Sequence, residues 1–238
     1  MKSNKKIALV TGGAKRIGQA ICKLLHESDI DLMIHYRHSA DEAKKLQENL
    51  NKIRKNSANI IQADLLDTSV LPNLVEETIK KYGRLDILIN NASSYYPTEI
   101  GKMNERNWND LIGSNLKAPL FLSQLAADEL IKTKGCIINI TDTHYSVAKS
   151  GLTTLTKSLA QELSPDVRVN AVAPGPVLWP ENNEEFNDIY KQRVISQTLL
   201  KKMGTPEDVA MAVKFLVLDA PFITGHILAV DGGRSLSL

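Results

Sequence analysis

The chain has 238 residues, of which 43% are hydrophobic and 24% are charged, a composition typical of globular proteins. The formal net charge of +2 provides no strongly basic surface for nucleic acid, and no apolar run reaches the roughly 18 residues that a membrane span needs. We therefore expect one domain over residues 1–238 with neither nucleic acid nor a membrane as partner. We also expect no bound metal, because the five histidines show no metal-ligand spacing.

The two cysteines, Cys22 and Cys136, lie far apart within apolar patterns, where small buried core residues are typical. The first residues are polar and lead directly into a strand-like run, without the apolar stretch of a secretion signal. Both observations favour a reducing, cytoplasmic location.

Runs of aliphatic and β-branched residues alternate along the chain with segments whose apolar residues recur at helical spacing. We predict strands at residues 7–10, 32–36, 59–63, 85–90, 135–140, 167–172 and 226–230. We predict helices at residues 17–25, 39–55, 68–82, 105–133, 145–163 and 206–218, and an irregular stretch that becomes helical between residues 174 and 200. Near-continuous apolar strands joined by helices indicate a parallel sheet covered on both faces. The predicted fold class is therefore α/β, a single-domain, Rossmann-like doubly wound sheet.

A glycine-rich turn at residues 11–18, Thr-Gly-Gly-Ala-Lys-Arg-Ile-Gly, joins the first predicted strand to the first predicted helix. In an open α/β sheet, this turn faces the crevice in which dinucleotides bind. Glycines allow the backbone to approach a pyrophosphate, and the helix N-terminus supplies N–H donors and a partial positive charge. The turn and its flanking elements thus predict a dinucleotide site.

The end of the second predicted strand discriminates between NAD and NADP, because an acidic residue there would bind the ribose 2′-hydroxyl. The chain instead has Arg37, His38 and Ser39, whose donors suit a 2′-phosphate. We expect Arg16, in the glycine-rich turn, to add a second positive charge across the same crevice. The alternative is that Arg37 and His38 belong to a solvated surface turn. Asp64, after the third predicted strand, could accept from the adenine amino group or instead cap a helix or turn.

Tyr145 and Lys149 lie one helical turn apart on one face of a predicted helix. A tyrosine is a poor proton donor near neutrality, because its ordinary pKa is about 10. A nearby ammonium stabilises the phenolate and makes proton exchange feasible. The pair therefore predicts an acid–base catalyst that follows the fifth strand.

Motifs from one end of the chain to the other resemble the short-chain dehydrogenase/reductase family. They are Thr11-Gly12 with Arg16 and Gly18, Asn90-Asn91-Ala92, Asn115, Tyr145 with Lys149, Pro174-Gly175 and Asp231-Gly232-Gly233. The resemblance implies that Tyr145 is the general acid, that Lys149 lowers its pKa and holds the nicotinamide ribose, and that Asn115 anchors a proton-relay water. The implied cofactor contacts are Gly12, Arg16, Ile17, Gly18, Tyr36, Arg37, His38, Ser39, Asp64, Leu65, Asn91, Ala92, Ser93, Tyr145, Lys149, Pro174 and Gly175.

Within these contacts, the resemblance assigns different parts of the dinucleotide to different residues. Pro174 and Gly175 would lie beside the nicotinamide carboxamide, and Asn91 and Ala92 along the adenosine ribose. The resemblance also implies a homotetramer.

Three residues depart from the general family pattern: Arg16 and Ser93 replace glycines, and Asp142 replaces the catalytic serine. A serine hydroxyl can donate to a carbonyl oxygen that becomes an oxyanion, whereas a carboxylate would repel that charge. Asp142 instead suits a substrate with N–H donors, or a ring nitrogen that must gain a proton. The alternative is that Asp142 is a strand-end cap.

These departures resemble the pteridine reductases of the family, including bacterial ones. So do the glycine-rich turn and the stretches at residues 35–39, 91–97 and 231–236. The resemblance implies that a pterin lies between the nicotinamide and the Tyr95 ring, with Ser93 at its polar edge and with Asp142 and Tyr145 as further substrate contacts. Stacking on Tyr95 would contribute about 1 kcal/mol beyond area burial. The alternative for Tyr95 is a partly buried loop aromatic.

The expected activity is NADPH-dependent reduction of dihydropterin to tetrahydropterin, and alternatively of oxidised pterin or folate. Asp142, Tyr145 and Lys149 would relay the proton. A second interpretation is a 3-oxoacyl carrier-protein reductase or another carbonyl reductase of the same family. A third is an NADP-sensing protein without chemistry, which would not need the pair of Tyr145 and Lys149.

The connection between Asp142 and Tyr145 contains only Thr143 and His144, and in the family it is longer. Two residues can span roughly 10 Å, so a true deletion is sterically feasible. We favour the other explanation, that the natural protein carries residues here that the printed sequence lacks. An intact mass near 26.3 kDa would refute it.

Overall fold

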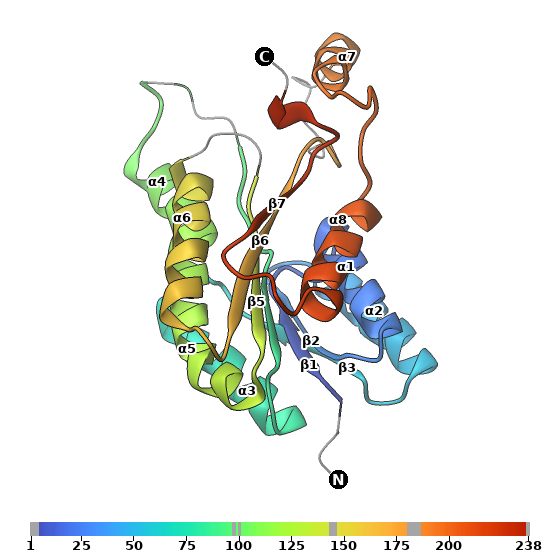
Figure 1. Ribbon diagram of the computed structural model, residues 1–238, viewed down its shortest axis with the longest axis vertical. Helices are drawn as coiled ribbons and strands as arrows, with labels where there is room; N and C mark the ends of the chain where they lie inside the picture. The colour runs from blue at the N-terminus through green and yellow to red at the C-terminus, as the bar shows by residue number, and fades with distance from the viewer. Residues whose placement is uncertain (1–4, 97–98, 100, 143–146, 180–186, 237–238) are drawn as a thin grey trace.

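The computed structural model contains one twisted sheet between two layers of helices (Figure 1). It describes residues 5–96, 99, 101–142, 147–179 and 187–236. The seven strands are all parallel and follow the order β3-β2-β1-β4-β5-β6-β7. They are β1 (Ile7–Val10), β2 (Asp31–Tyr36), β3 (Ala58–Gln62), β4 (Ile87–Asn90), β5 (Cys136–Ile140), β6 (Arg168–Pro174) and β7 (Ile227–Val230). The doubly wound α/β fold is confirmed.

The helices form one layer on each face of the sheet, with α1, α2 and α8 on one face and α3, α4, α5 and α6 on the other (Figure 1). Their bounds are α1 (Arg16–Glu27), α2 (Ala40–Ile53), α3 (Leu71–Tyr82), α4 (Glu105–Ile112), α5 (Ala118–Thr133), α6 (Val147–Glu162), α7 (Asp188–Ser196) and α8 (Pro206–Lys214). Short 3-10 turns cover Thr68–Val70 and Arg234–Leu236, and π-helical turns cover Gly113–Lys117 and Phe215–Asp219.

The strands are continuously apolar because both faces of the sheet are covered. In β1, Ile7 and Leu9 pack into the core beneath α3 and α5, whereas Ala8 and Val10 pack into the core beneath α1 and α8. All four residues are fully buried. The alternation follows from the two-residue period of a strand, and it fixes which strand residues point towards which helix layer.

The helix predicted over residues 105–133 is interrupted by one π-helical turn, Gly113–Lys117, which joins α4 to α5. Such turns are frequent at functional sites. Here the turn contains Asn115, which is 3% exposed. The extra residue in the turn therefore directs one of the predicted site residues towards the interior.

The other element predictions agree with the structure within a few residues. The helix predicted over residues 145–163 is described as Val147–Glu162, and residues 145 and 146 lie outside the described part of the chain. Pro72 stands in the first turn of α3, where proline is tolerated. Cys22 and Cys136 are free and buried, as predicted, and burial raises the pKa of both thiols.

Candidate active site

The glycine-rich turn between β1 and α1 is a close approach of three backbone segments. Gly12 has a φ of +60°, and a Cβ atom there would lie 2.9 Å from the Cα of Ala92. A Cβ atom on Gly18 would lie 2.2 Å from the carbonyl oxygen of Gly12. Both positions therefore require glycine, and the turn is held against the segment that follows β4.

Thr11 and Asn91 fasten this turn to the end of β4. The Asn91 Nδ2 donates to the carbonyl oxygens of Thr11 at 2.9 Å and Gly12 at 3.0 Å. The Thr11 Oγ1 accepts from the backbone N–H groups of Asn91 at 2.9 Å and Ala92 at 3.0 Å. The Asn91 amide thus shapes the turn, a role additional to the ribose contact expected from the sequence.

His35 in β2 supports the same turn, and the sequence analysis did not identify it. Its Nδ1 accepts from the N–H of Gly12 at 3.1 Å, and its Nε2 lies 3.1 Å from the carbonyl oxygen of Ala63, to which it donates in this tautomer. Burial lowers the pKa of His35 to about 4, so the ring is neutral near pH 7. The available signal was a polar residue within an otherwise apolar strand.

The residues expected around the adenosine lie at the carboxyl ends of β2 and β3. The Arg37 Nη2 is 2.8 Å from the Asp64 Oδ2, and the other Asp64 oxygen accepts from the N–H of Leu66 at 3.1 Å. Asp64 thus does cap a turn, one of the two alternatives left open. The neighbouring members of the predicted set are the half-buried Tyr36 and Ser39, the exposed His38 and the buried Leu65.

Ser39 occupies the N-cap position of α2, but within the described residues its side chain makes no capping hydrogen bond. Ser39 thus stands at the start of the helix predicted over residues 39–55, with a φ of −90° and a ψ of 58°. Its hydroxyl is not used as a helix cap in this structure.

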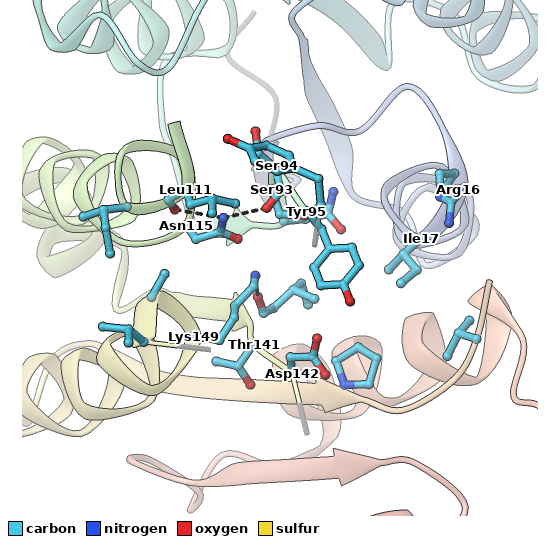
Figure 2. A pocket seen from close by; sticks show the side chains of 18 of the residues that line it. Arg16, Ile17, Ser93, Ser94, Tyr95, Leu111, Asn115, Thr141, Asp142 and Lys149 are labelled. Carbon is cyan, nitrogen blue, oxygen red and sulfur yellow. Dashed lines mark hydrogen bonds between the residues drawn. The ribbon is translucent and has the colours of Figure 1, made fainter. Parts of the chain in front are cut away.

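A cavity of about 600 Å³ lies at the carboxyl ends of β1, β4, β5 and β6 (Figure 2). This is the edge of an open α/β sheet where ligands bind. The predicted site residues that line it are Arg16, Ile17, Asn91, Ser93, Tyr95, Asn115, Asp142, Lys149, Pro174 and Gly175. The described substrate contacts therefore share one cavity with part of the predicted cofactor site. The other described cofactor contacts do not line it: Gly12, Gly18, Tyr36, Arg37, His38, Ser39, Asp64, Leu65 and Ala92.

Lys149 enters this cavity from the first turn of α6. Its Nζ donates to the carbonyl oxygen of Ile140, the last residue of β5, at 2.7 Å. Desolvation lowers the pKa of Lys149 to about 8, and the nearby Asp142 carboxylate opposes this shift in part. The side chain is therefore a mostly protonated cation at pH 7 that can exchange its proton within the physiological range.

Asn115 faces the cavity from the π-helical turn. Its Nδ2 donates to the carbonyl oxygens of Ser94 at 2.9 Å and Leu111 at 3.0 Å. Its Oδ1 is buried and has no hydrogen-bond partner among the described residues. A buried acceptor of this kind is satisfied by a water or a ligand group.

Tyr95 and Asp142 reach the cavity from opposite walls. Figure 2 shows the Tyr95 ring projecting into the cavity, with its hydroxyl end towards the wall that carries Asp142. Burial raises the pKa of the Tyr95 hydroxyl, and Tyr190 and Asp142 raise it further. The residue as a whole is 66% exposed, so its ring can offer a face to a flat ligand.

Arg16 lines this cavity, and Arg37 is not among the residues that line it. That Arg16 adds a positive charge for the 2′-phosphate therefore stays a prediction. The Arg16 Nη2 donates to the carbonyl oxygen of Trp179 at 3.1 Å, across the cavity mouth. The Trp179 ring makes an edge contact with Tyr190 of α7, with centroids 6.3 Å apart. Arg16 has a φ of +54°, the left-handed conformation that favours glycine. The backbone thus explains why the family has glycine here.

Tyr145, the predicted general acid, lies outside the described residues, as do Thr143, His144 and Ser146. Only its flanks are placed: Asp142 follows β5, and Val147 begins α6. Both flanks line the cavity.

Within the described part of the chain, no helix combines the length and the apolar character that a membrane span requires. The same residues contain no group of His, Cys, Asp and Glu side chains that could hold a metal ion.

Comparisons with known proteins agree on one family. A family model described as enoyl-(acyl carrier protein) reductase matches residues 12–235. The 3-oxoacyl-(acyl-carrier-protein) reductase FabG of Staphylococcus aureus is 32% identical over 241 residues, covering 96% of this chain and 97% of the relative. Pteridine reductase 1 of Leishmania tarentolae is 34% identical over 282 residues, covering 97% of this chain and 96% of the relative. FabG of Thermotoga maritima is 30% identical over 252 residues, covering 98% and 99%.

The fold, the cavity and these matches define an oxidoreductase that uses a nicotinamide dinucleotide. The chain belongs to the short-chain dehydrogenase/reductase family. All three alignments are longer than the 238 residues of the chain, so each relative has residues without a counterpart here.

The described residues fit such a dinucleotide. The glycine positions leave no room for a side chain, so the turn presents backbone at its surface. α1 begins after Lys15, whose side chain has no acceptor that could cap the first N–H groups of the helix. The turn and the helix N-terminus thus suit a pyrophosphate, and Lys149 together with the buried Asn115 Oδ1 suits a ribose and an ordered water.

Proposed function

We propose that the protein is an NADPH-dependent pterin reductase that converts dihydropterins to tetrahydropterins, with oxidised pterins or folate as further substrates. The observation that carries the proposal is the position of the Asp142 carboxylate. It lines the same cavity as Lys149 and lies close enough to raise the pKa of Lys149. At this position a carboxylate opposes reduction of a ketone, because negative charge develops on the carbonyl oxygen. It favours a substrate that presents N–H groups.

The proposed reaction reduces a C=N bond. When bound, NADPH would supply a hydride to the carbon and the ring nitrogen would gain a proton, so that NADPH, H⁺ and dihydropterin would become NADP⁺ and tetrahydropterin. Asp142 accepts a hydrogen bond from the substrate and holds it in orientation. Tyr145 and Lys149 deliver the proton, and Asn115 anchors a water through its buried Oδ1. Tyr95 supplies the stacking face, and Ser93 touches the polar edge.

Preference for NADPH is proposed from Arg37, His38 and Ser39. Arg37 offers a planar guanidinium to a 2′-phosphate, and the Ser39 hydroxyl does not cap α2 in the described part of the chain. Arg37→Ala should weaken NADPH binding about 10–100-fold while changing NADH binding little. Titration with each cofactor measures the dissociation constants of NADPH and NADH. If the ratio of the two constants is the same in Arg37→Ala as in the wild-type protein, Arg37 does not recognise the 2′-phosphate.

The substrate is tested by NADPH oxidation with a panel of pterins beside an acetoacetyl thioester. The proposal expects turnover with dihydropterin and weak or no turnover with the thioester. The reverse order would support the second candidate, a 3-oxoacyl carrier-protein reductase. That candidate is favoured by the near-complete coverage of two relatives with this name at 32% and 30% identity. Absence of turnover with every substrate would support an NADP-sensing protein.

We propose a homotetramer built through two apolar surfaces on opposite sides of the subunit. On α5, the outward residues Leu120, Phe121, Leu125 and Ile131 are between 37% and 40% exposed. On the other side, Met211, Phe215 and Phe222 are exposed near β7, an edge strand. Exposed apolar surface of this kind marks contacts between proteins, and two isologous contacts give a closed tetramer. Light scattering should show a tetramer that Leu125→Glu reduces to a dimer. A monomeric wild-type protein would contradict this.

We also propose that the protein works in the cytoplasm, on the basis of its two free, buried thiols.

A further inference from the structure

A chain of polar contacts joins Arg37, at the proposed 2′-phosphate position, to the wall of the cavity. Asp110 of α4 lies in its middle. The Asp110 Oδ1 is 4.0 Å from the Arg37 Nη1 and accepts a 3.1 Å hydrogen bond from the Ser94 Oγ. Ser94 lies between Ser93 and Tyr95, which line the cavity. One carboxylate oxygen thus faces both the cofactor-side cation and the substrate-side segment, residues 93–95.

Segment 93–95 is itself tied to Asn115. The Ser94 carbonyl oxygen accepts from the Asn115 Nδ2 at 2.9 Å, and the Ser94 N–H donates to the Ser114 Oγ at 3.2 Å. The Ser114 Oγ donates in turn to the backbone carbonyl oxygen of Asp110 at 2.7 Å. A movement of the Asp110 side chain would therefore alter its hydrogen bond to Ser94 and, through Ser94, the position of Asn115.

The Arg37 guanidinium lies near two carboxylates, those of Asp64 and Asp110. Its Nη2 pairs with Asp64 at 2.8 Å, and its Nη1 stands at a longer distance from Asp110. Its Nε is buried and has no hydrogen-bond partner in the part of the chain that the structure describes. Arg37 and Asp110 also line an open cavity of about 1210 Å³ behind α4, which leaves room for the guanidinium to turn. A phosphate is a strong bidentate partner for arginine and competes with the looser carboxylate.

We propose that Asp110 is a positioning residue that couples recognition of the 2′-phosphate to the order of segment 93–95. When Arg37 turns to the phosphate, the Asp110 carboxylate loses its cationic neighbour and accepts more strongly from the Ser94 hydroxyl. The stronger hydrogen bond reduces the mobility of segment 93–95 and of Asn115, both of which contact the substrate in the proposed complex. The inference rests on the proposed preference for NADPH. It predicts that NADP⁺ tightens substrate binding about 5-fold more than NAD⁺ does.

The first experiment measures the dissociation constant of dihydropterin from the enzyme loaded with NADP⁺ or with NAD⁺, neither of which can reduce it. The wild-type ratio should be about 5. Ser94→Ala, which removes the hydroxyl and keeps the backbone contacts, should bring the ratio to about 1, and Asp110→Asn should do the same. Ser158→Ala, at an exposed serine of α6, is the matched control and should keep the wild-type ratio. A ratio that survives in both Ser94→Ala and Asp110→Asn overturns the inference.

The second experiment needs no substrate and separates this inference from the proposed activity. Hydrogen–deuterium exchange of segment 93–95 should slow more on addition of NADP⁺ than of NAD⁺, and the difference should vanish in Ser94→Ala. If dihydropterin does not bind but this difference is present, the pterin proposal fails and the coupling stands. If dihydropterin binds but both cofactors protect the segment equally, the coupling fails and the pterin proposal stands. If NADP⁺ does not bind, both fail.

Discussion

The Lys149 ammonium donates a 2.7 Å hydrogen bond to the carbonyl oxygen of Ile140, two residues before Asp142. This contact ties the first turn of α6 to the carboxyl end of β5. It holds the cation beside the carboxylate at the edge where the cavity opens. The geometry keeps a positive charge in the cavity, and the Lys149 pKa of about 8 makes that charge dependent on pH.

Catalysis should therefore weaken in mildly alkaline solution. Lys149 is cationic below its pKa of about 8 and neutral above it, so kcat/KM for dihydropterin should fall as the pH rises through that value. Initial rates measured from one pH unit below the Lys149 pKa to one unit above it give the pH dependence of kcat/KM. Lys149→Arg is the control, because arginine keeps its charge, and its fall should move to higher pH. A wild-type profile that stays flat across this window would contradict the role.

Asp142→Ser should impair turnover of the pterin and leave cofactor binding intact. Serine can still accept a hydrogen bond, but it lacks the negative charge and the reach of the carboxylate, so kcat/KM with dihydropterin should fall roughly 100-fold. The dissociation constant of NADPH should change little. Asp142→Asn keeps the shape and an acceptor oxygen, and should retain more of the substrate affinity. Equal losses in turnover and NADPH affinity for Asp142→Ser would show that Asp142 only supports the fold.

Arg16 combines a strained backbone with a contact across the cavity, and the two can be separated. Arg16→Ala and Arg16→Gly both lose the hydrogen bond to the Trp179 carbonyl oxygen. Only glycine relieves the left-handed φ of +54°. Arg16→Gly should therefore be more stable than Arg16→Ala by roughly 0.5–1 kcal/mol, after the entropy cost of glycine. Urea unfolding of both variants measures this, and equal stabilities would show that the residue carries no strain.

His35 should make stability depend on pH in weakly acidic solution. Its folded pKa of about 4 lies below the ordinary 6.5, so between these values the unfolded chain binds more protons. The contribution is full above pH 6.5 and is lost as the pH falls towards 4, up to about 3 kcal/mol.

His35→Asn cannot titrate and carries an acceptor that can serve the Gly12 N–H. Its unfolding free energy should depend less steeply on pH across that window. Some dependence should remain, since burial also lowers the pKa of His26. Identical slopes in the wild-type and variant proteins would contradict the assignment to His35.

The fold could be predicted because its signals are local. Apolar runs such as residues 7–10, the glycine-rich turn and the first-turn proline of α3 each specify their own conformation. The π-helical turn at Gly113–Lys117, which interrupts one predicted helix, could not be predicted. Its bonding depends on packing against a helix far along the chain, α6.

The site was predictable only in part. The membership of the cavity followed from the rule that ligands bind at the carboxyl ends of parallel strands. The contacts from Arg16 to Trp179 and from Asp110 to Arg37 join segments far apart in sequence. No local pattern marks such a pair. His35 is marked in the sequence only as a polar residue in an apolar strand, and its partner could not be predicted because that partner is a backbone N–H of a different segment.

The central claim is that this site transfers a hydride from NADPH to a pterin ring. It is tested most directly with NADPH deuterated at the 4R or the 4S position, incubated with dihydropterin and the enzyme. Mass spectrometry should find one deuterium atom in the tetrahydropterin from one of the two cofactors and none from the other. Oxidation of NADPH that leaves no deuterium in the pterin with either cofactor would contradict the claim.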